Sequence, residues 1–281
     1  MSVSNPYVPK SARIEEIITE TAVNDVKTFR MVFTESEDRE SFRYEPGQFA
    51  ELSLPGVGEA PISITSSPTQ EGYLEFSIKK AGKLTTALHH AEVGQEVGIR
   101  GPYGNVFPVD SLEGKDLQFI AGGIGLAPLR SLFNYCIDPK NRQRFGSIVM
   151  IYGARSPGDL VFKWELEKWA EAEDLALYVT VDRGDEQWDG RVGFVPAILM
   201  DVSPSPNNAV AITCGPPIMI KFVIQSLEEL GFTPEQIVTT LEMRMKCGIG
   251  KCGRCNIGSQ YVCLDGPVFT YAQLKEMPQE Y

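Results

Sequence analysis

Four cysteines near the carboxyl terminus constrain this chain more than any other feature. Cys247, Cys252, Cys255 and Cys263 have the spacing C-x4-C-x2-C-x7-C, and they are four of the six cysteines in a chain of 281 residues. The first part of the pattern, C-x4-C-x2-C, is the spacing of plant-type [2Fe–2S] ligation. A structural zinc site also takes four cysteines, but such sites usually repeat C-x2-C pairs. The spacing favours an iron–sulfur cluster, with zinc as the alternative.

The residues between these cysteines suit an anionic cluster. Glycines at 248, 250 and 253 permit unusual backbone angles and let amide N–H groups approach sulfur. No acidic residue lies between positions 243 and 256, whereas four basic residues do: Arg244, Lys246, Lys251 and Arg254. A local positive charge favours the thiolate form of the ligands and the negative charge of a cluster.

The charge of the whole chain excludes several function classes. It has 26 basic and 37 acidic residues, a net charge of −11, so a nucleic-acid partner is not expected. No apolar run reaches the roughly 18 residues that a membrane span requires, and the first residues do not form a signal peptide. We therefore expect a cytoplasmic chain without a membrane span, in which thiols stay reduced and the cysteines are not a disulfide framework.

The first part of the chain has the pattern of an antiparallel β-barrel or sandwich. Short alternating stretches, such as Lys27–Phe33, Phe49–Leu54 and Tyr73–Ile78, are separated by Pro- and Gly-containing turns. One short helix is expected at about Leu84–Ala91. We predict a first domain over residues 1–110.

The middle of the chain repeats the order strand, glycine turn, helix. Apolar runs at Asp116–Ala121, Ile148–Tyr152, Leu175–Val181 and Ala209–Thr213 predict strands. A stripe at i, i+3, i+4, i+7 and i+8 predicts a helix with these core positions: Leu129, Leu132, Phe133, Cys136 and Ile137. Alternating strands and helices indicate a parallel α/β domain over residues 111–235, followed by a cysteine-rich module over residues 236–281.

Two turns in this domain are candidates for ligand binding. Gly122-Gly123-Ile124-Gly125 and Pro128 stand between a strand and a helix, where backbone amides can meet a pyrophosphate. The pattern is not the full dinucleotide signature, so a plain tight turn is the alternative. Cys214-Gly215-Pro216 ends the last predicted strand; Cys214 itself also fits a small buried core residue.

Together and in this order, these motifs resemble the ferredoxin–NAD(P)+ reductase superfamily. The branch they resemble contains electron-transfer subunits with FAD and a [2Fe–2S] cluster. It includes the gamma subunits of cytoplasmic NiFe hydrogenases and sulfur reductases, and the electron-transfer subunits of anaerobic sulfite reductase and of dihydroorotate dehydrogenase. The resemblance covers nearly the whole chain and implies an FAD-binding β-barrel, an NAD(P)-binding α/β domain and a small [2Fe–2S] module.

The resemblance also implies where FAD binds. The flavin signature R-P-x-S stands here as Ala60-Pro61-Ile62-Ser63, so the arginine that usually meets the pyrophosphate is absent. The residues implied to contact FAD are Pro61, Ile62, Ser63, Ile64, Thr65, Ser66, Ile78, Lys79, Lys80, Gly82, Leu84 and Thr85.

For nicotinamide dinucleotide, the resemblance implies binding across the glycine turn. The implied residues are Gly122, Gly123, Ile124, Gly125, Pro128, Arg155, Cys214, Gly215 and Pro216, with Cys214 near the nicotinamide ring. Asp182 and Arg183 follow a strand side by side, so the choice between NAD(H) and NADP(H) stays open. His89 and His90 are expected in a surface or capping role, and no side-chain acid or base is expected because hydride transfer needs none.

The implied function is that of a diaphorase subunit. It would move a hydride between NAD(P)H and FAD, and single electrons between FAD and the cluster, to another redox subunit of a hydrogenase or of a sulfur or sulfite reductase complex. The alternatives are the electron-transfer subunit of dihydroorotate dehydrogenase and a zinc-stapled subunit without enzyme activity. A reductase for a soluble oxygenase is disfavoured, because the cysteine module is too short for a complete ferredoxin domain.

Overall fold

The amino-terminal part of the chain forms a six-stranded antiparallel sheet in the computed structural model, which describes residues 5–278. Its strands lie in the order β4 (Gly58–Ser63), β3 (Phe49–Leu54), β6 (Glu96–Tyr103), β1 (Lys10–Thr19), β2 (Val26–Phe33) and β5 (Leu74–Lys79). The two outer strands approach each other, because the N–H of Thr65, just after β4, donates to the carbonyl oxygen of Glu75 on β5 (2.9 Å). The sheet therefore curls into a barrel.

Alternation of apolar side chains explains why these strands close around a core. Buried side chains from most of the strands fill the barrel: Ala12, Ile14, Phe29, Met31, Leu52, Phe76, Ile78 and Ile99. Helix α1 (Ser36–Ser41) lies beside β2, and helix α2 (Lys83–His89) packs against β3 and β4.

The packing of α2 corrects one expectation. His89 is buried, not a surface residue, and its Nε2 lies 2.8 Å from the carbonyl oxygen of Ile78. Burial lowers the pKa of His89 below its ordinary value. Its neighbour His90 is exposed and ends the helix.

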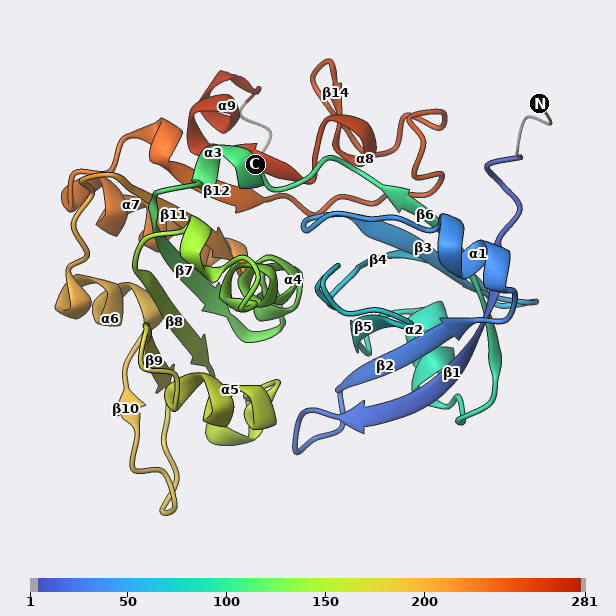
Figure 1. Cartoon of the computed structure of the whole chain (residues 1–281), viewed down its shortest axis with the longest axis horizontal. Helices are drawn as coiled ribbons and strands as arrows, with labels where there is room; N and C mark the ends of the chain where they lie inside the picture. The colour runs from blue at the N-terminus through green and yellow to red at the C-terminus, as the bar shows by residue number, and fades with distance from the viewer. Residues whose placement is uncertain (1–4, 279–281) are drawn as a thin grey trace.

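The second sheet has seven strands and is parallel except at one edge. The order is β10 (Arg191–Val192), β9 (Leu175–Val181), β8 (Ile148–Ala154), β7 (Asp116–Gly122), β11 (Ala209–Cys214), β12 (Ile237–Thr240) and β15 (Val268–Thr270), and only β15 runs antiparallel to its neighbour. Helices α4 (Leu126–Ile137) and α5 (Lys163–Ala170) cover the face towards the barrel, and α6 (Val195–Val202) and α7 (Pro217–Glu229) cover the other face (Figure 1). The predicted fold class is confirmed.

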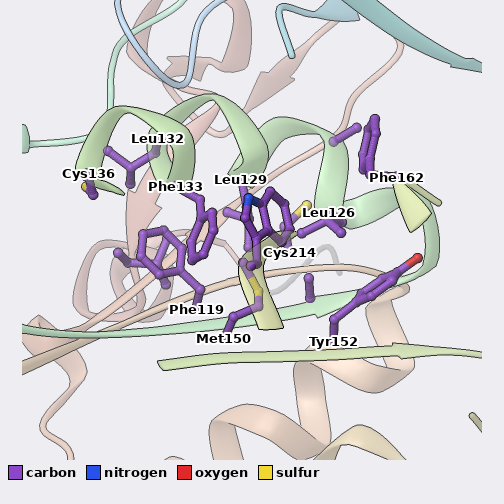
Figure 2. Close-up of a cluster of buried hydrophobic side chains, with 14 of the residues drawn as sticks. Phe119, Leu126, Leu129, Leu132, Phe133, Cys136, Met150, Tyr152, Phe162 and Cys214 are labelled. Carbon is purple, nitrogen blue, oxygen red and sulfur yellow. The ribbon is translucent and has the colours of Figure 1, made fainter. Parts of the chain in front are cut away.

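Helix α4 sits on the core of this domain. Its apolar stripe faces strands β7 and β8, and the ring of Phe133 meets Phe119 of β7 edge-on, with centroids 5.2 Å apart (Figure 2). Cys136 is fully buried at the end of the same stripe, as its spacing predicts. This packing fixes the direction in which α4 leaves the glycine turn.

The cysteine-rich module leaves the large sheet after β12 and returns at β15. Between and after these strands lie the hairpin β13 (Asn256–Ile257) and β14 (Gln260–Tyr261), α8 (Val262–Asp265) and α9 (Tyr271–Glu276), while α3 (Val109–Leu112) connects the barrel to the large sheet. Figure 1 shows α8 and β14 above the barrel strands β3 and β6. The domain boundary between residues 235 and 236 stays a prediction, because β12 on its far side belongs to the large sheet.

A buried arginine joins the barrel to the α/β domain. Arg130 of α4 forms an ion pair with Glu165 of α5, and its Nη1 donates to Glu75 of the barrel (2.7 Å) and to the carbonyl oxygen of Thr65 (3.1 Å). All three charged side chains are almost wholly inaccessible to solvent. Among the described residues no helix is long and apolar enough to cross a membrane.

Candidate functional site

A cleft of about 920 Å³ opens where the large sheet faces the barrel. Its floor is formed by the carboxyl ends of β7, β8 and β11, the edge at which parallel sheets bind ligands. The barrel contributes Thr21, Asp25, Val26 and Lys79. The structure brings nine of the predicted site residues to this cleft: Lys79, Gly122, Gly123, Ile124, Gly125, Arg155, Cys214, Gly215 and Pro216. Pro128 does not line it and stands in the first turn of α4.

The two turns of the cleft touch each other closely. A side-chain carbon on Gly125 would stand 2.5 Å from the carbonyl oxygen of Cys214 and 2.6 Å from the Cα of Gly215. Gly123, at the tip of the turn, has a φ of +54°, a left-handed angle that favours glycine, and has open space around it. Glycine is therefore required at 125 by packing, and at 123 by backbone conformation.

Cys214 is both a core residue and a lining residue. It is buried, and the hydroxyl of Thr240 donates a hydrogen bond to its Sγ (3.0 Å). Burial raises the pKa of the thiol to about 12 despite that hydrogen bond, and the nearby carboxylate of Glu242 raises it further. The side chain is therefore a neutral thiol at physiological pH, without nucleophilic character. Glu242 also lines the cleft, and nothing in the sequence pattern pointed to it.

The outer part of the cleft carries charges of both signs. Arg155 is exposed and pairs with Asp159 (2.8 Å), and both line the cleft. Asp182 lines it as well, whereas its neighbour Arg183 does not. Burial raises the pKa of Asp182, and the two arginines act in the opposite direction.

Three large apolar side chains also line the cleft, although they are largely solvent-exposed. Phe194 is 67% exposed, Ile218 is 62% exposed and Phe222 is 49% exposed. Exposed apolar surface gathered in one cleft suits a flat ring of a ligand. Phe194 and Ile218 precede or open helices and lie on no apolar stripe, so periodicity did not single them out.

The segment predicted to bind FAD divides into an accessible part and an internal part. Pro61, Ile62 and Ser63 on β4 are partly accessible, whereas Ile64, Thr65 and Ser66 are buried. The Oγ of Ser66 accepts from the N–H of Glu75 (3.0 Å) and shares a hydrogen bond with the hydroxyl of Tyr44 (2.9 Å). The buried part therefore closes the barrel.

Residues 65 and 66 also form hydrogen bonds with the α/β domain. The hydroxyl of Ser131 donates to the carbonyl oxygen of Ser66 (2.7 Å), beside the contact of Arg130 with Thr65. Arg130 and Ser131 are both in α4, just after the glycine turn. One helix thus connects the predicted FAD segment to the predicted dinucleotide turn.

The second group of predicted FAD residues surrounds the start of α2. The N–H of Gly82 donates to the Oγ1 of Thr85 (2.8 Å), and Gly82 is exposed with open space beside it. Leu84 and Ile78 are buried in the barrel core, and Lys80 is exposed. The structure does not bring these residues to the cleft; from this group only Lys79, named above, reaches it.

Arg100 links strand β4, which carries the first predicted FAD residues, to the cysteine loop. This residue of β6 is buried, and it pairs with Glu59 on β4 (2.6 Å), next to Ala60. Its Nη1 also donates to the carbonyl oxygen of Cys247 (3.3 Å) and to the hydroxyl of Tyr103 (2.9 Å). Sequence reasoning missed Arg100, because Glu59 and Cys247, which it connects, are distant from it along the chain.

Glu51 of β3 is a buried carboxyl group in the same region. It pairs in register with Pro61 on one side and Arg100 on the other, and neither of its oxygens has a hydrogen-bond partner among the described residues. Burial raises the pKa of Glu51 from 4.5 to about 7; Glu59 raises it further and Arg100 opposes the shift.

The four cysteines come together at one loop. Cys252 acts on the thiol of Cys247, and both Cys255 and Cys247 act on the thiol of Cys263. Cys252 is exposed and the other three are buried. Among residues 5–278, no three His, Cys, Asp or Glu side chains converge as the ligands of a single ion would.

Backbone amides point at these sulfurs. The N–H groups of Lys251 and Cys252 donate to the Sγ of Cys247 (3.3 and 3.4 Å), and that of Gly250 donates to Cys263 (3.2 Å). Burial alone would raise the pKa of Cys247, but the amide hydrogen bonds outweigh it and hold the pKa at about 7. The glycines of the loop at positions 248, 250 and 253 have φ values of +72°, +68° and +70°, which these contacts require. Burial and the neighbouring Cys255 raise the pKa of Cys263, so the amide hydrogen bonds favour the thiolate form at Cys247 in particular.

The loop packs directly on the barrel. Met245, Ile257 and Val262 form an apolar cluster with Phe49 of β3 and the partly buried Tyr103 of β6. A side chain at position 248 would stand 2.6 Å from the ring of Tyr103. The cysteines consequently lie next to β3, the strand that pairs with the predicted FAD segment on β4.

A barrel, a parallel sheet with a glycine-lined cleft and a four-cysteine loop define a class of proteins: oxidoreductases that bind FAD, a nicotinamide dinucleotide and an iron–sulfur cluster. Family models match each part, as an oxidoreductase FAD-binding domain (residues 15–107), an oxidoreductase NAD-binding domain (residues 119–225) and the iron–sulfur cluster binding domain of dihydroorotate dehydrogenase B (residues 242–275). The predicted enzyme class is confirmed.

Known proteins narrow this class to a family. The chain is 45% identical to sulfhydrogenase 1 subunit gamma of Pyrococcus furiosus, over 99% of this chain and 96% of that protein. It is 34% identical to a probable dihydroorotate dehydrogenase B (NAD+) electron transfer subunit of the same organism, over 93% of this chain and 90% of that one. The chain belongs to this family of ferredoxin–NADP reductase-like electron-transfer subunits, and the resemblance stated above is confirmed. The fold also matches a solved NADH-dependent reduced ferredoxin–NADP oxidoreductase, with a TM-score of 0.73 at 23% identity over 99% of this chain and 91% of that one.

Proposed function

We propose that this chain is the diaphorase subunit of a larger redox complex. When bound, FAD and NAD(P)H supply two-electron hydride transfer, and the iron–sulfur cluster supplies single-electron transfer to a partner protein. The observation that carries the proposal is the order of the three sites in space. The glycine cleft meets the barrel at Lys79, and the barrel meets the cysteine loop through Phe49 and Arg100.

The residues of the chain hold and orient the three groups. Gly123 has open space around it for a dinucleotide pyrophosphate at the start of α4, and Gly125 holds the turn against Cys214 and Gly215. Pro61 to Ser63, Lys79, Lys80 and Gly82 belong to the accessible part of the predicted FAD site. Arg130 and Ser131 fix the distance between these two regions, because they sit on α4 and bind the FAD segment.

The cysteine spacing supports a [2Fe–2S] cluster over zinc. Cys247, Cys252 and Cys255 have the C-x4-C-x2-C spacing of plant-type clusters, whereas zinc sites usually repeat C-x2-C pairs. Backbone N–H groups also donate to the sulfurs of Cys247 and Cys263, an arrangement that suits the ligands of an anionic cluster. The chain is proposed to work in the cytoplasm, where thiols stay reduced.

The partner is proposed to be a hydrogenase or sulfur-reducing subunit. The support is the 45% identity to a sulfhydrogenase gamma subunit across nearly all of both chains, against 34% for a dihydroorotate dehydrogenase B electron transfer subunit of the same organism. The second candidate, a dihydroorotate dehydrogenase subunit, is favoured by the family model that matches the cysteine module.

Replacing one exposed cysteine tests the assignment of the cluster. Cys252→Ala is expected to abolish the electron paramagnetic resonance signal of the reduced cluster and to lower the iron content, while NAD(P)H still bleaches the flavin. Cys252 is exposed, so the fold should be unaffected. Cys136→Ala, in the buried core, is the matched control and should keep the signal. A full signal and unchanged iron content in Cys252→Ala would contradict the assignment.

A further inference from the structure

Four exposed basic residues lie within or just before the cysteine loop in the sequence. They are Arg244, Lys246, Lys251 and Arg254, together named here the basic rim. All four are exposed, and none forms an ion pair with another residue in the described range 5–278. Cys252 and the 51% exposed Leu264 are exposed in the same module.

The basic rim contrasts with the rest of the molecule. Residues 236–281 carry five basic and four acidic side chains, a net charge of +1, so the preceding 235 residues carry −12 and the whole chain −11. Elsewhere many arginines are paired with carboxylates, as Arg144 is with Glu113 and Arg155 is with Asp159. The concentration of positive charge at the cysteine loop is therefore a local feature of an acidic protein.

Stability of the fold does not explain this arrangement. Exposed charges are screened by water and contribute little to stability, and the four side chains pair with no carboxylate in the part of the chain that the structure describes. Their charge does act at a distance, because a patch of one sign attracts a partner of opposite sign before contact. The exposed Cys252 marks the point at which the cluster would come nearest to the surface.

We propose that the basic rim is the docking surface for the redox partner, and that the partner presents an acidic face around its own electron-accepting centre. This inference rests on the proposed function, since it places the exit of electrons at the cysteine loop. It adds the chemistry of the partner: a protein surface rich in aspartate and glutamate, with its redox centre within that surface. The net charge of −11 alone would repel such a partner.

Two small electron acceptors of opposite charge can report the local charge where electrons leave the protein at the cysteine loop. NAD(P)H-driven reduction of hexacyanoferrate(III), an anion, and of hexaammineruthenium(III), a cation, is followed while the ionic strength rises from about 10 mM to about 500 mM. We expect the rate with the anion to fall about ten-fold and the rate with the cation not to fall. Rates from Cys252→Ala are subtracted, because they report any direct transfer from the flavin. A rate with the anion that rises with salt follows the net charge of the chain and overturns the proposal.

Charge reversal provides the matched comparison. Lys251→Glu combined with Arg254→Glu should reverse the salt dependence with the anion. Lys140→Glu combined with Lys163→Glu changes the total charge equally, at exposed lysines outside the module, and should leave the dependence unchanged. If the reversed variant loses its cluster, Lys251→Gln combined with Arg254→Gln replaces it and should weaken the dependence without reversing it. Equal effects of the two double variants would refute the basic rim as the docking surface.

The iron content and the cluster signal of each preparation separate the two levels of inference. A missing cluster signal in the unaltered protein contradicts the proposed function. A normal cluster signal, together with a reduction rate whose salt dependence follows the net charge of the chain, contradicts only the proposed docking surface. The basic rim could instead bind a second copy of this acidic chain, and light scattering at low salt tests this alternative. If the unaltered protein forms a dimer and the Lys251→Glu, Arg254→Glu variant does not, the basic rim serves self-association and the proposal is overturned.

Discussion

Arg130 is the residue whose loss should affect the fold most. Arg130→Met keeps much of the side-chain volume but removes the charge that both Glu165 and Glu75 face in the interior. Glu75 keeps a second cation, Arg30 (2.9 Å), whereas Glu165 keeps, among residues 5–278, the side-chain amide of Asn134 (3.2 Å). Breaking a buried ion pair by removing one partner costs about 3–5 kcal/mol, because the remaining charge stays buried without compensation. We expect a loss of this size in the free energy of unfolding, mainly from Glu165.

Urea denaturation followed by tryptophan fluorescence measures this loss. Arg144→Met is the matched control, since Arg144 pairs with Glu113 at the surface and should cost at most about 1 kcal/mol. Adding Glu165→Gln to Arg130→Met removes the stranded charge and should restore about half of the loss. If Arg130→Met costs no more than the control, or if Glu165→Gln restores nothing, the reasoning about buried charge is wrong.

Three further predictions concern the sites. The pKa of Glu51 is raised in the folded chain, so as pH rises this carboxyl group ionises first in the unfolded chain. The free energy of unfolding should therefore fall as pH rises from 4.5 to about 7. Glu51→Gln should remove this slope and add about 3 kcal/mol above pH 7, as measured by denaturation at several pH values. Gly125→Ala places a methyl group against Cys214 and should abolish flavin bleaching by NAD(P)H, while dithionite still gives the full cluster signal; unchanged bleaching would remove the turn from the dinucleotide site. Asp182→Ala removes a carboxylate that would repel a 2′-phosphate, and should raise kcat/KM for NADPH relative to NADH about ten-fold; an unchanged ratio places Asp182 away from the ribose.

Regular apolar patterns made most of the fold predictable. The strands at Phe49–Leu54 and Leu175–Val181 have the bounds that the sequence indicates, and the stripe of α4 faces the core. Strand β1 is not among the stretches named from the sequence; its pairing with β2 shifts between Ile14 and Glu16, an irregularity that interrupts the alternation. Helix α6 was also missed: it has eight residues, and Pro196 and nearly continuous apolar residues hide its period.

The site was predictable where chemistry depends on spacing along the chain. The cysteine pattern and the glycine turn are local signals, and the structure brings the residues of each together. Arg100 and Arg130 are not local signals, because Arg100 reaches Cys247 and Arg130 reaches Glu75, both far along the chain, and basic residues are usually exposed. His89 was misjudged for the same reason: only the packing of α2 on the barrel shows that it is buried.

An anaerobic titration with NAD(P)H tests the central claim most directly. FAD takes two electrons and a [2Fe–2S] cluster takes one, so full reduction should need about 1.5 equivalents of NAD(P)H per chain. Flavin absorbance, the cluster signal and the iron content are followed together, and the account predicts about one FAD and about two irons per chain. Full reduction at about one equivalent, with zinc in place of iron and no cluster signal, would contradict it.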